Sequence, residues 1–200
     1  NQRRRNCPSY GGARKMRVAV LALQGAFIEH EAVCKRLGAE CIELREKSDL
    51  DKNFDYLILP GGESTVQGKL LRELDMFEGL KKRIQDGMPV LATCAGLILL
   101  AQHSDDGRTN FATLPVSVKR NAYGRQLGSF YTSGDFAGIG NVPMTFIRAP
   151  AIESVSPDVQ ILARHENTIV AVKYKNQLAM AFHPELGGDD RIHKMFLELN

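Results

Sequence analysis

Continuous apolar runs, each leading through a turn into another regular element, most constrain how this chain can fold. Residues 17–23 are almost wholly apolar, without polar alternation, which indicates a strand buried on both faces. Further strands are predicted at 41–44, 56–59 and 88–92, and helices at 26–37, 66–86 (two pieces divided near Asp75) and 95–101. This order predicts an α/β fold, a flavodoxin-like three-layer sandwich with a mostly parallel central sheet and helices on both faces.

The second half of the chain has a different pattern. Short strands, typical of extra antiparallel pairs, are predicted at 116–118, 128–131, 144–147, 160–162, 169–172 and 178–182. Turn residues at 133–135 and 175–176 are expected to separate neighbouring strands, and a last helix is expected at 189–199.

Residues 1–15 are polar and basic, and Met16 opens the first strand. We expect 1–15 to be a disordered extension or a remnant foreign to the natural chain, and 16–200 to form a single domain. The net charge of +3 is too small to indicate nucleic-acid binding, so the basic cluster Arg3-Arg4-Arg5 is interpreted as a solvated tail.

The four cysteines, Cys7, Cys34, Cys41 and Cys94, form no CxxC pair and have no metal-ligand spacing. Few cysteines in a chain of 200 residues indicate a reducing compartment, and a cytoplasmic protein is expected. No apolar run reaches the roughly 18 residues of a membrane span. We expect no metal, no cofactor, no membrane and no nucleic acid.

Cys94 lies where the strand at 88–92 gives way to the helix at 95–101. The start of a helix presents free N–H groups and partial positive charge, which favour a thiolate, the nucleophilic form of cysteine. Small neighbours, Ala92, Ala95 and Gly96, allow a sharp turn and a close substrate. The pattern predicts a cysteine version of the nucleophile elbow.

Other strand ends carry polar or glycine residues that should meet Cys94. Gln24-Gly25 and the segment 60–63 follow predicted parallel strands, and such sheets place their sites beyond the carboxyl ends of the strands. His183 and Glu185 close the last predicted strand, where alternate residues project from one face.

This combination predicts a triad. Cys94 attacks a carbonyl carbon, His183 accepts the thiol proton and returns it to the leaving group, and Glu185 orients the imidazole. Backbone N–H groups of Ala95 and Gly62 are predicted to form the oxyanion hole. Each part has a plainer interpretation, because a buried cysteine is commonly a packing residue and Gly-Gly commonly forms an ordinary turn.

Longer motifs then resemble a known family. The chain is similar to the class I (triad) glutamine amidotransferases, and within them to the glutaminase subunits of pyridoxal 5'-phosphate synthase, the PdxT/SNO family. The motifs that carry this resemblance occur in the family's order: Leu23-Gln24-Gly25, Leu59-Pro60-Gly61-Gly62-Glu63-Ser64-Thr65, Thr93-Cys94-Ala95-Gly96-Leu97, Arg120-Asn121-Ala122-Tyr123-Gly124-Arg125-Gln126, Phe146-Ile147-Arg148-Ala149-Pro150 and Phe182-His183-Pro184-Glu185.

The resemblance implies a class I glutamine amidotransferase-like fold and hydrolysis of L-glutamine to L-glutamate and ammonia through a thioester on Cys94. It implies a glutamine site lined by Gly62, Glu63, Ser64, Arg120, Ile147 and Arg148. It also implies a partner, the (β/α)₈-barrel synthase subunit, which receives the ammonia in a hetero-oligomer that makes pyridoxal 5'-phosphate (vitamin B6). Arg120 or Arg148 could bind the substrate carboxylate, or could pair with a structural acid.

Two other functions remain open at this point. The chain could be a class I amidotransferase subunit of another pathway. It could also be a flavodoxin-like cysteine hydrolase or a binding module, in which the elbow cysteine would not pair with His183.

Overall fold

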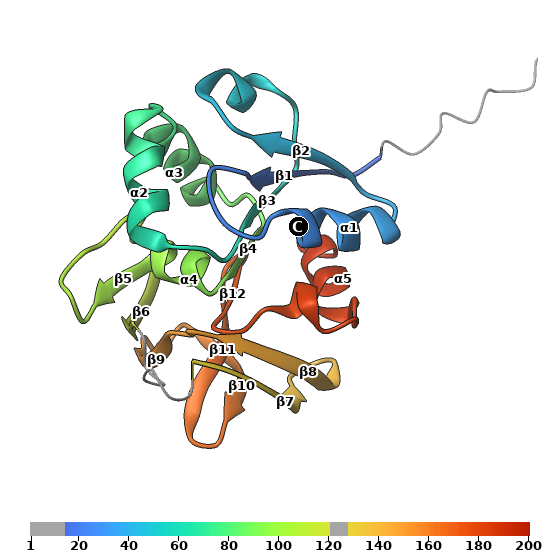
Figure 1. The fold of residues 1–200 in the computed structure, drawn as a ribbon, viewed down its shortest axis with the longest axis vertical. Helices are drawn as coiled ribbons and strands as arrows, with labels where there is room; N and C mark the ends of the chain where they lie inside the picture. The colour runs from blue at the N-terminus through green and yellow to red at the C-terminus, as the bar shows by residue number, and fades with distance from the viewer. Residues whose placement is uncertain (1–14, 121–127) are drawn as a thin grey trace, which may run out of the picture.

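A parallel sheet between two layers of helices forms the centre of the computed structural model, which describes residues 15–120 and 128–200 (Figure 1). Residues 1–14 of the predicted extension and 121–126 of the arginine motif lie outside the described residues. Five neighbouring strands run parallel, in the order β2 (Glu40–Leu44), β1 (Arg17–Leu21), β3 (Tyr56–Leu59), β4 (Val90–Thr93) and β12 (Gln177–Met180).

Helices cover both faces of these strands, as predicted. Figure 1 shows one layer beside the sheet and a second layer on the opposite side. The first layer contains α2 (Ser64–Glu73), α3 (Phe77–Gln85) and α4 (Ala95–Leu100), and the second contains α1 (Ile28–Arg36) and α5 (Arg191–Leu197). The break predicted near Asp75 is confirmed, because Asp75 has a positive φ of 55° between α2 and α3.

Antiparallel strands extend the sheet beyond β12. They are β11 (Thr168–Tyr174), β9 (Ala151–Val155) and β6 (Leu114–Lys119), followed by β5 (Ala101–Ser104), which is parallel to β6; β10 (Gln160–His165) pairs with β11. The sequence prediction missed β9 and assigned Ala101 to a helix, although this residue begins β5. The turn expected at 175–176 is confirmed between β11 and β12.

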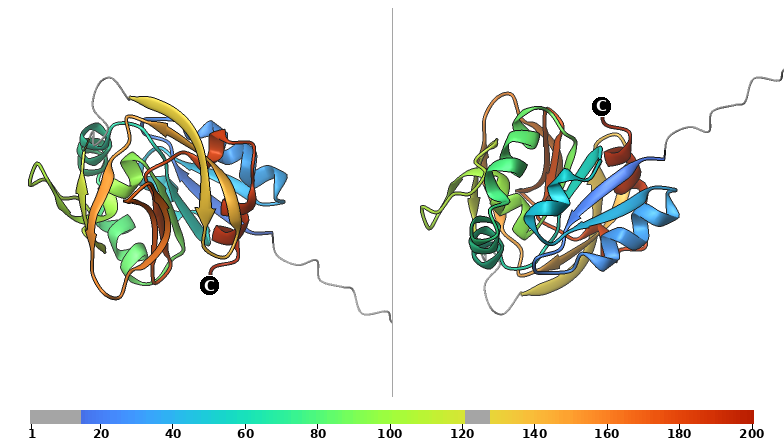
Figure 2. Two further views of the ribbon diagram at one scale, coloured as in Figure 1. Left: turned by 90° about the horizontal axis from the view of Figure 1, so that it is seen from below. Right: turned by 90° about the horizontal axis from the view of Figure 1, so that it is seen from above.

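A separate two-stranded ribbon lies beside this sheet (Figures 1 and 2). It consists of β7 (Ser129–Phe136) and β8 (Gly140–Ile147). The turn predicted at 133–135 is wrong, because these residues lie inside β7 and pair with residues 141–143 of β8. Their composition is typical of a turn, but ladder pairing with β8 overrides this local preference. The ribbon matters for function because β8 ends near Cys94.

Short 3₁₀ helices occupy two loops, η1 (Lys47–Asp51) and η2 (Pro184–Leu186). The second corrects the sequence prediction, which placed His183 and Glu185 on a strand. β12 ends at Met180, and the chain bends into η2 immediately after His183. Proline at the first position of η2 suits this bend, because its fixed φ is compatible with a helical start and its missing N–H is not needed there.

Candidate active site

Cys94 lies in a strained turn between β4 and α4. Its φ of 51° and ψ of −103° are unusual for a residue with a side chain. The backbone N–H of Cys94 donates a 2.9 Å hydrogen bond to the carbonyl oxygen of Met180 in β12, which fixes the turn to the sheet. The side chain is almost completely buried. The predicted elbow is therefore present, and the sheet holds its strained backbone in place.

Gly96 allows the elbow to pack against the neighbouring strand. A Cβ atom at this position would lie 2.1 Å from the carbonyl oxygen of Leu59, the last residue of β3. Because the obstacle is backbone rather than a movable side chain, α4 can start here only if its second residue is glycine. Ala92, two residues before the nucleophile, is buried in β4 and does not have a positive φ.

The thiol of Cys94 contacts groups from two distant segments. It lies beside the imidazole of His183, whose pKa it raises, and its Sγ lies 3.7 Å from the carbonyl oxygen of Ile147 at the end of β8. The backbone N–H of His183 donates to the carbonyl oxygen of Thr145, also in β8, over 2.8 Å. The β7–β8 ribbon thus contacts both Cys94 and His183.

His183 and Glu185 meet through η2. The Nδ1 atom of His183 lies 2.6 Å from Oε1 of Glu185, a short hydrogen bond between buried groups. A carboxylate oxygen only accepts, so Nδ1 carries a proton, and Nε2 is left as the ring nitrogen available to a substrate or to the thiol. The predicted juxtaposition occurs, but the 3₁₀ turn brings the two side chains together rather than strand alternation.

Opposing effects set the charge of this pair. Burial works to lower the pKa of His183, but its hydrogen bonds with Cys94 and Glu185, together with the charges of these partners, raise the pKa to about 10. Burial works to raise the pKa of Glu185, yet the nearby histidines His30 and His183 hold it below its ordinary value. The imidazole can therefore hold the thiol proton at neutral pH, and the carboxylate stays ionised.

A glycine loop after β3 packs directly on the imidazole. A Cβ atom on Gly61 would lie 2.4 Å from Cε1 of His183. Gly62 has a φ of 150°, and a Cβ there would lie 2.4 Å from Oε1 of Gln24. That same oxygen accepts a 2.7 Å hydrogen bond from the backbone N–H of Glu63. The structure thus brings the loops after β1 and β3 together beside His183, the convergence of strand ends that the sequence predicted.

Gln67 in α2 joins the loops after β1 and β3, and the sequence prediction did not identify it. Its Nε2 donates to the backbone oxygens of Gln24 and Pro60, at 3.1 and 3.3 Å. The residue is completely buried in the first turns of α2. The signal that could have found it is a glutamine on the inward face of a helix that directly follows the glycine loop.

The predicted substrate residues fall into two groups. Arg120 makes ion pairs with Oε1 of Glu63 (3.0 Å) and with Oδ2 of Asp106 (2.6 Å). Glu63 also caps α2 by accepting the backbone N–H of Val66, and Ser64 begins that helix. Arg120 therefore pairs with acids, as the alternative interpretation expected, but one of these acids is itself a predicted site residue.

Ile147 and Arg148 form the second group, on the β8 side of the nucleophile. Arg148 has a positive φ of 45° and its backbone N–H donates to the carbonyl oxygen of Gly128. The carbonyl of Ile147 faces the thiol, so this group reaches the site through its backbone.

Two further histidines stand behind the triad, and neither was predicted as a site residue. His30 of α1 lies 3.4 Å from Oε2 of Glu185 and 3.3 Å from Oγ1 of Thr93. His193 of α5 lies 2.9 Å from Nδ1 of His30. In residues 15–120 and 128–200, no group of His, Cys, Asp or Glu side chains is arranged to hold a metal ion.

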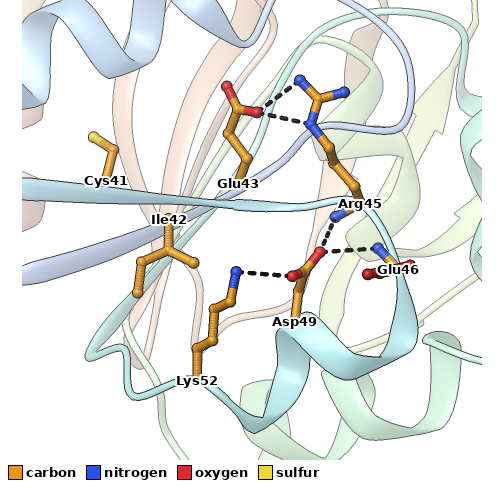
Figure 3. A pocket seen from close by; sticks show the side chains of 7 residues that line it. All are labelled: Cys41, Ile42, Glu43, Arg45, Glu46, Asp49 and Lys52. Atoms are coloured by element: carbon orange, nitrogen blue, oxygen red, sulfur yellow. Dashed lines mark hydrogen bonds and ion pairs between the residues drawn. The ribbon is translucent and has the colours of Figure 1, made fainter.

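A hollow of about 620 Å³ lies elsewhere, beside β2 and η1 (Figure 3). Its charged side chains pair with one another, Glu43 with Arg45 and Asp49 with Lys52. None of the predicted site residues lines it. In the part of the chain that the structure describes, no helix combines the length and the apolar character that crossing a membrane requires.

Known proteins resemble this chain over nearly its whole length. Residues 20–200 match the model of the SNO glutamine amidotransferase family. A protein of Desulfitobacterium hafniense (strain DSM 10664 / DCB-2), "Pyridoxal 5'-phosphate synthase subunit PdxT", is 66% identical over 92% of each chain. A protein of Methanocorpusculum labreanum with the same name is 54% identical over 92% of this chain and 97% of its own.

Solved structures agree with this likeness. A crystal structure of a glutamine amidotransferase is 42% identical, covers 90% of this chain and 97% of its own, and superposes with a TM-score of 0.84. The PurLQS structure from Thermotoga maritima is only 15% identical, with a TM-score of 0.67 over 92% of this chain and 98% of its own. This second likeness concerns the fold alone.

Proposed function

This chain belongs to the SNO glutamine amidotransferase family, and from that premise we propose that it hydrolyses L-glutamine to L-glutamate and ammonia as the glutaminase subunit of pyridoxal 5'-phosphate synthase. The observation that carries the chemistry is the buried line Cys94–His183–Glu185, in which the elbow after β4 meets the turn into η2 and His183 makes a 2.6 Å hydrogen bond with Glu185. We treat residues 16–200 as one glutaminase domain.

The reaction begins with the thiol. His183, whose pKa is raised to about 10, accepts the proton of Cys94, and Sγ attacks the side-chain amide carbon of glutamine. The tetrahedral intermediate collapses when the C–N bond breaks, and the imidazolium gives its proton to the leaving nitrogen, which departs as ammonia. Water then attacks the thioester with His183 as base, releasing glutamate and the thiol.

Backbone N–H groups would stabilise the oxyanion. The N–H of Ala95 belongs to the first turn of α4, where N–H groups lack partners within the helix. The N–H of Glu63 is engaged by Oε1 of Gln24, so we assign the second donor to Gly62. Ala95 follows the nucleophile in sequence, and Gly62 lies in the loop whose preceding residue, Gly61, packs on His183.

The substrate's charged end would bind where Arg120 now pairs with Glu63. Glutamine carries an α-carboxylate and an α-ammonium, so it can replace one ion pair by two, with its carboxylate on Arg120 and its ammonium on Glu63. Gly62, Ser64, Ile147 and Arg148 complete the proposed site. The bidentate guanidinium favours a carboxylate of fixed orientation, which suits a free amino acid.

The ammonia needs an acceptor, since in neutral water it becomes protonated and loses its nucleophilicity. We propose that the chain docks on a (β/α)₈-barrel synthase subunit in a hetero-oligomer, and that it does so in the cytoplasm. The three described cysteines are all free, which supports a reducing compartment.

A glutaminase assay with and without the cognate barrel subunit tests this function. Cys94→Ala should abolish glutamate release, while Cys41→Ala, which removes a half-buried thiol on β2, should leave it unchanged. Full activity of Cys94→Ala would overturn the mechanism. Co-purification with a different synthase, with no response to the barrel, would instead favour an amidotransferase of another pathway.

A further inference from the structure

A chain of fully buried polar groups continues behind the triad. His30 and His193 have no exposed surface, and neither has Thr93, the residue before the nucleophile. The two imidazole rings lie 5.1 Å apart between centroids and join α1 to α5. Burying a polar side chain is costly unless it is paired, so a cluster of this kind beside an active site calls for a role.

The directions of the hydrogen bonds follow from the carboxylate. Nε2 of His30 faces Oε2 of Glu185, which can only accept, so the Nε2–H tautomer is the one that offers this buried oxygen a donor. Burial lowers the pKa of His30 and outweighs the attraction of Glu185, so the ring is neutral and its Nδ1 must accept. His193 then donates from Nε2 to Nδ1 of His30 over 2.9 Å.

The far end of the chain is consistent with this direction. Nδ1 of His193 is then an unprotonated acceptor, and it has no hydrogen-bond partner within the described residues. Burial lowers the pKa of His193 to about 3, so the ring is neutral at physiological pH. The donors therefore converge on Glu185: His193 donates to His30, His30 faces Oε2 of the carboxylate, and His183 donates to Oε1 from the other side.

The second carboxylate oxygen of Glu185, Oε2, needs a hydrogen-bond donor that His30 is placed to supply. Among residues 15–120 and 128–200 this buried oxygen has no hydrogen bond of good geometry, and its contact with Nε2 of His30 is long, at 3.4 Å. Catalytic hydrogen bonds are commonly long before substrate binds and tighten afterwards. Thr93 shares the same donor at 3.3 Å and links His30 to the elbow.

We propose that His30 is a positioning residue of the glutaminase: as a neutral Nε2–H donor, itself oriented by His193, it holds the second carboxylate oxygen of Glu185 and so keeps the carboxylate ionised and aligned with His183. This inference rests on the proposed function. Loss of the donor leaves a buried carboxylate oxygen unpaired, which lets Glu185 rotate away from Nδ1 of His183 and weakens its support of the imidazolium.

Two substitutions at His30 separate this role from simple packing. His30→Gln can place an amide donor where Nε2 lies and keep the contact with Glu185. His30→Asn reaches only the level of Nδ1 and keeps the contact with His193. In the complex with the barrel subunit, we expect His30→Asn to lower kcat by about 10- to 100-fold, the cost of one hydrogen bond to a charged group, and His30→Gln to recover most of it.

The pH profile gives a readout that packing alone would not move. The titratable groups that face or lie near His30 are Glu185 from η2, His193 from α5, Glu29 on its own helix and His183 beyond the carboxylate. In His30→Asn the alkaline limb of kcat/KM should move to lower pH. Alkylation of Cys94 by iodoacetamide, followed by peptide mass spectrometry, should be slower at neutral pH, because a less basic imidazole maintains less thiolate. In His30→Gln both readouts should stay near those of the wild type.

The native protein offers a second test that needs no substitution. With five histidines in the chain, ¹⁵N-histidine NMR can assign each tautomer. Neutral Nε2–H forms of His30 and His193 at pH 7 support the proposal, and a charged His30 or its Nδ1–H form overturns it.

The possible outcomes distinguish the positioning role of His30 from the proposed glutaminase function. Wild-type kinetics and pH limbs in His30→Asn overturn the positioning role while leaving the glutaminase intact. If the wild-type complex releases no glutamate from glutamine, the proposed glutaminase function is overturned. The role of His30 can still be decided by Cys94 alkylation and histidine NMR.

Discussion

Gly61→Ala should inactivate this enzyme by displacing the imidazole of His183. The new Cβ would lie 2.4 Å from Cε1 of His183, whereas ordinary van der Waals contact begins near 3.4 Å, so the imidazole must move by about 1 Å. The backbone of Gly61 does not have a positive φ, so alanine itself is tolerated there and the conflict lies with the ring. A shift of this size also stretches the 2.6 Å hydrogen bond to Glu185.

Misplacement of a catalytic group by about 1 Å can cost roughly 100-fold in rate, or about 2.7 kcal/mol of transition-state stabilisation. We therefore expect kcat for glutamate release, measured with the barrel subunit present, to fall by about two orders of magnitude. The thermal midpoint should change little, because the backbone of Gly61 already has a conformation that alanine tolerates.

Gly79→Ala is the matched control. Gly79 also lacks a positive φ, and its Cβ would meet only the flexible end of Leu50, at 3.0 Å, and the Arg83 guanidinium, far from the site in sequence. Activity of Gly61→Ala within about threefold of wild type would refute the steric argument. An equal loss in both variants would show that the effect is general destabilisation instead.

Three further predictions follow from the same geometry. Gly96→Ala forces a Cβ to within 2.1 Å of the Leu59 carbonyl, and denaturant unfolding should show a loss of about 1–3 kcal/mol or more. Arg120→Ala removes the proposed carboxylate contact, so KM for glutamine should rise at least tenfold with a smaller change in kcat, measured by initial rates. Because the pKa of His183 is raised to about 10, its imidazole stays protonated through the neutral range. The contribution of this charge to the free energy of unfolding is fully present below the ordinary histidine pKa near 6.5 and is lost as pH rises through 10. Both kcat/KM and the free energy of unfolding should therefore fall toward pH 10. A rise in activity through neutral pH would reflect deprotonation of the Cys94 thiol. A flat profile from neutral pH to above 10 would contradict the assignment of His183.

Local sequence was sufficient for the elements whose signal is local. The buried strands of the parallel core, the helix break at Asp75 and the elbow at Cys94 all lie where the sequence predicted them. Apolar runs, turn residues and helical spacing act over a few residues, so they can be recognised without knowing the partners.

Elements that depend on a distant partner were not predictable in this way. Residues 133–135 have the composition of a turn but become a strand through pairing with β8. The sequence correctly predicted that His183 would meet Glu185, but for the wrong reason, because the bend into η2 is set by the packing of β8 and α1 around it.

The sequence by itself predicted Cys94 as nucleophile, His183 as base and Glu185 as its orienting acid, and it determined the buried strands of the parallel core, because each of these signals lies within one short segment. Only the tertiary structure decided that His30 and His193 are buried behind Glu185 and that Gly61 packs on the imidazole. Burial and hydrogen-bond direction are properties of groups brought together from α1, α5, β4 and η2. No single segment contains that information, because the free energy of a polar group depends on what surrounds it after folding.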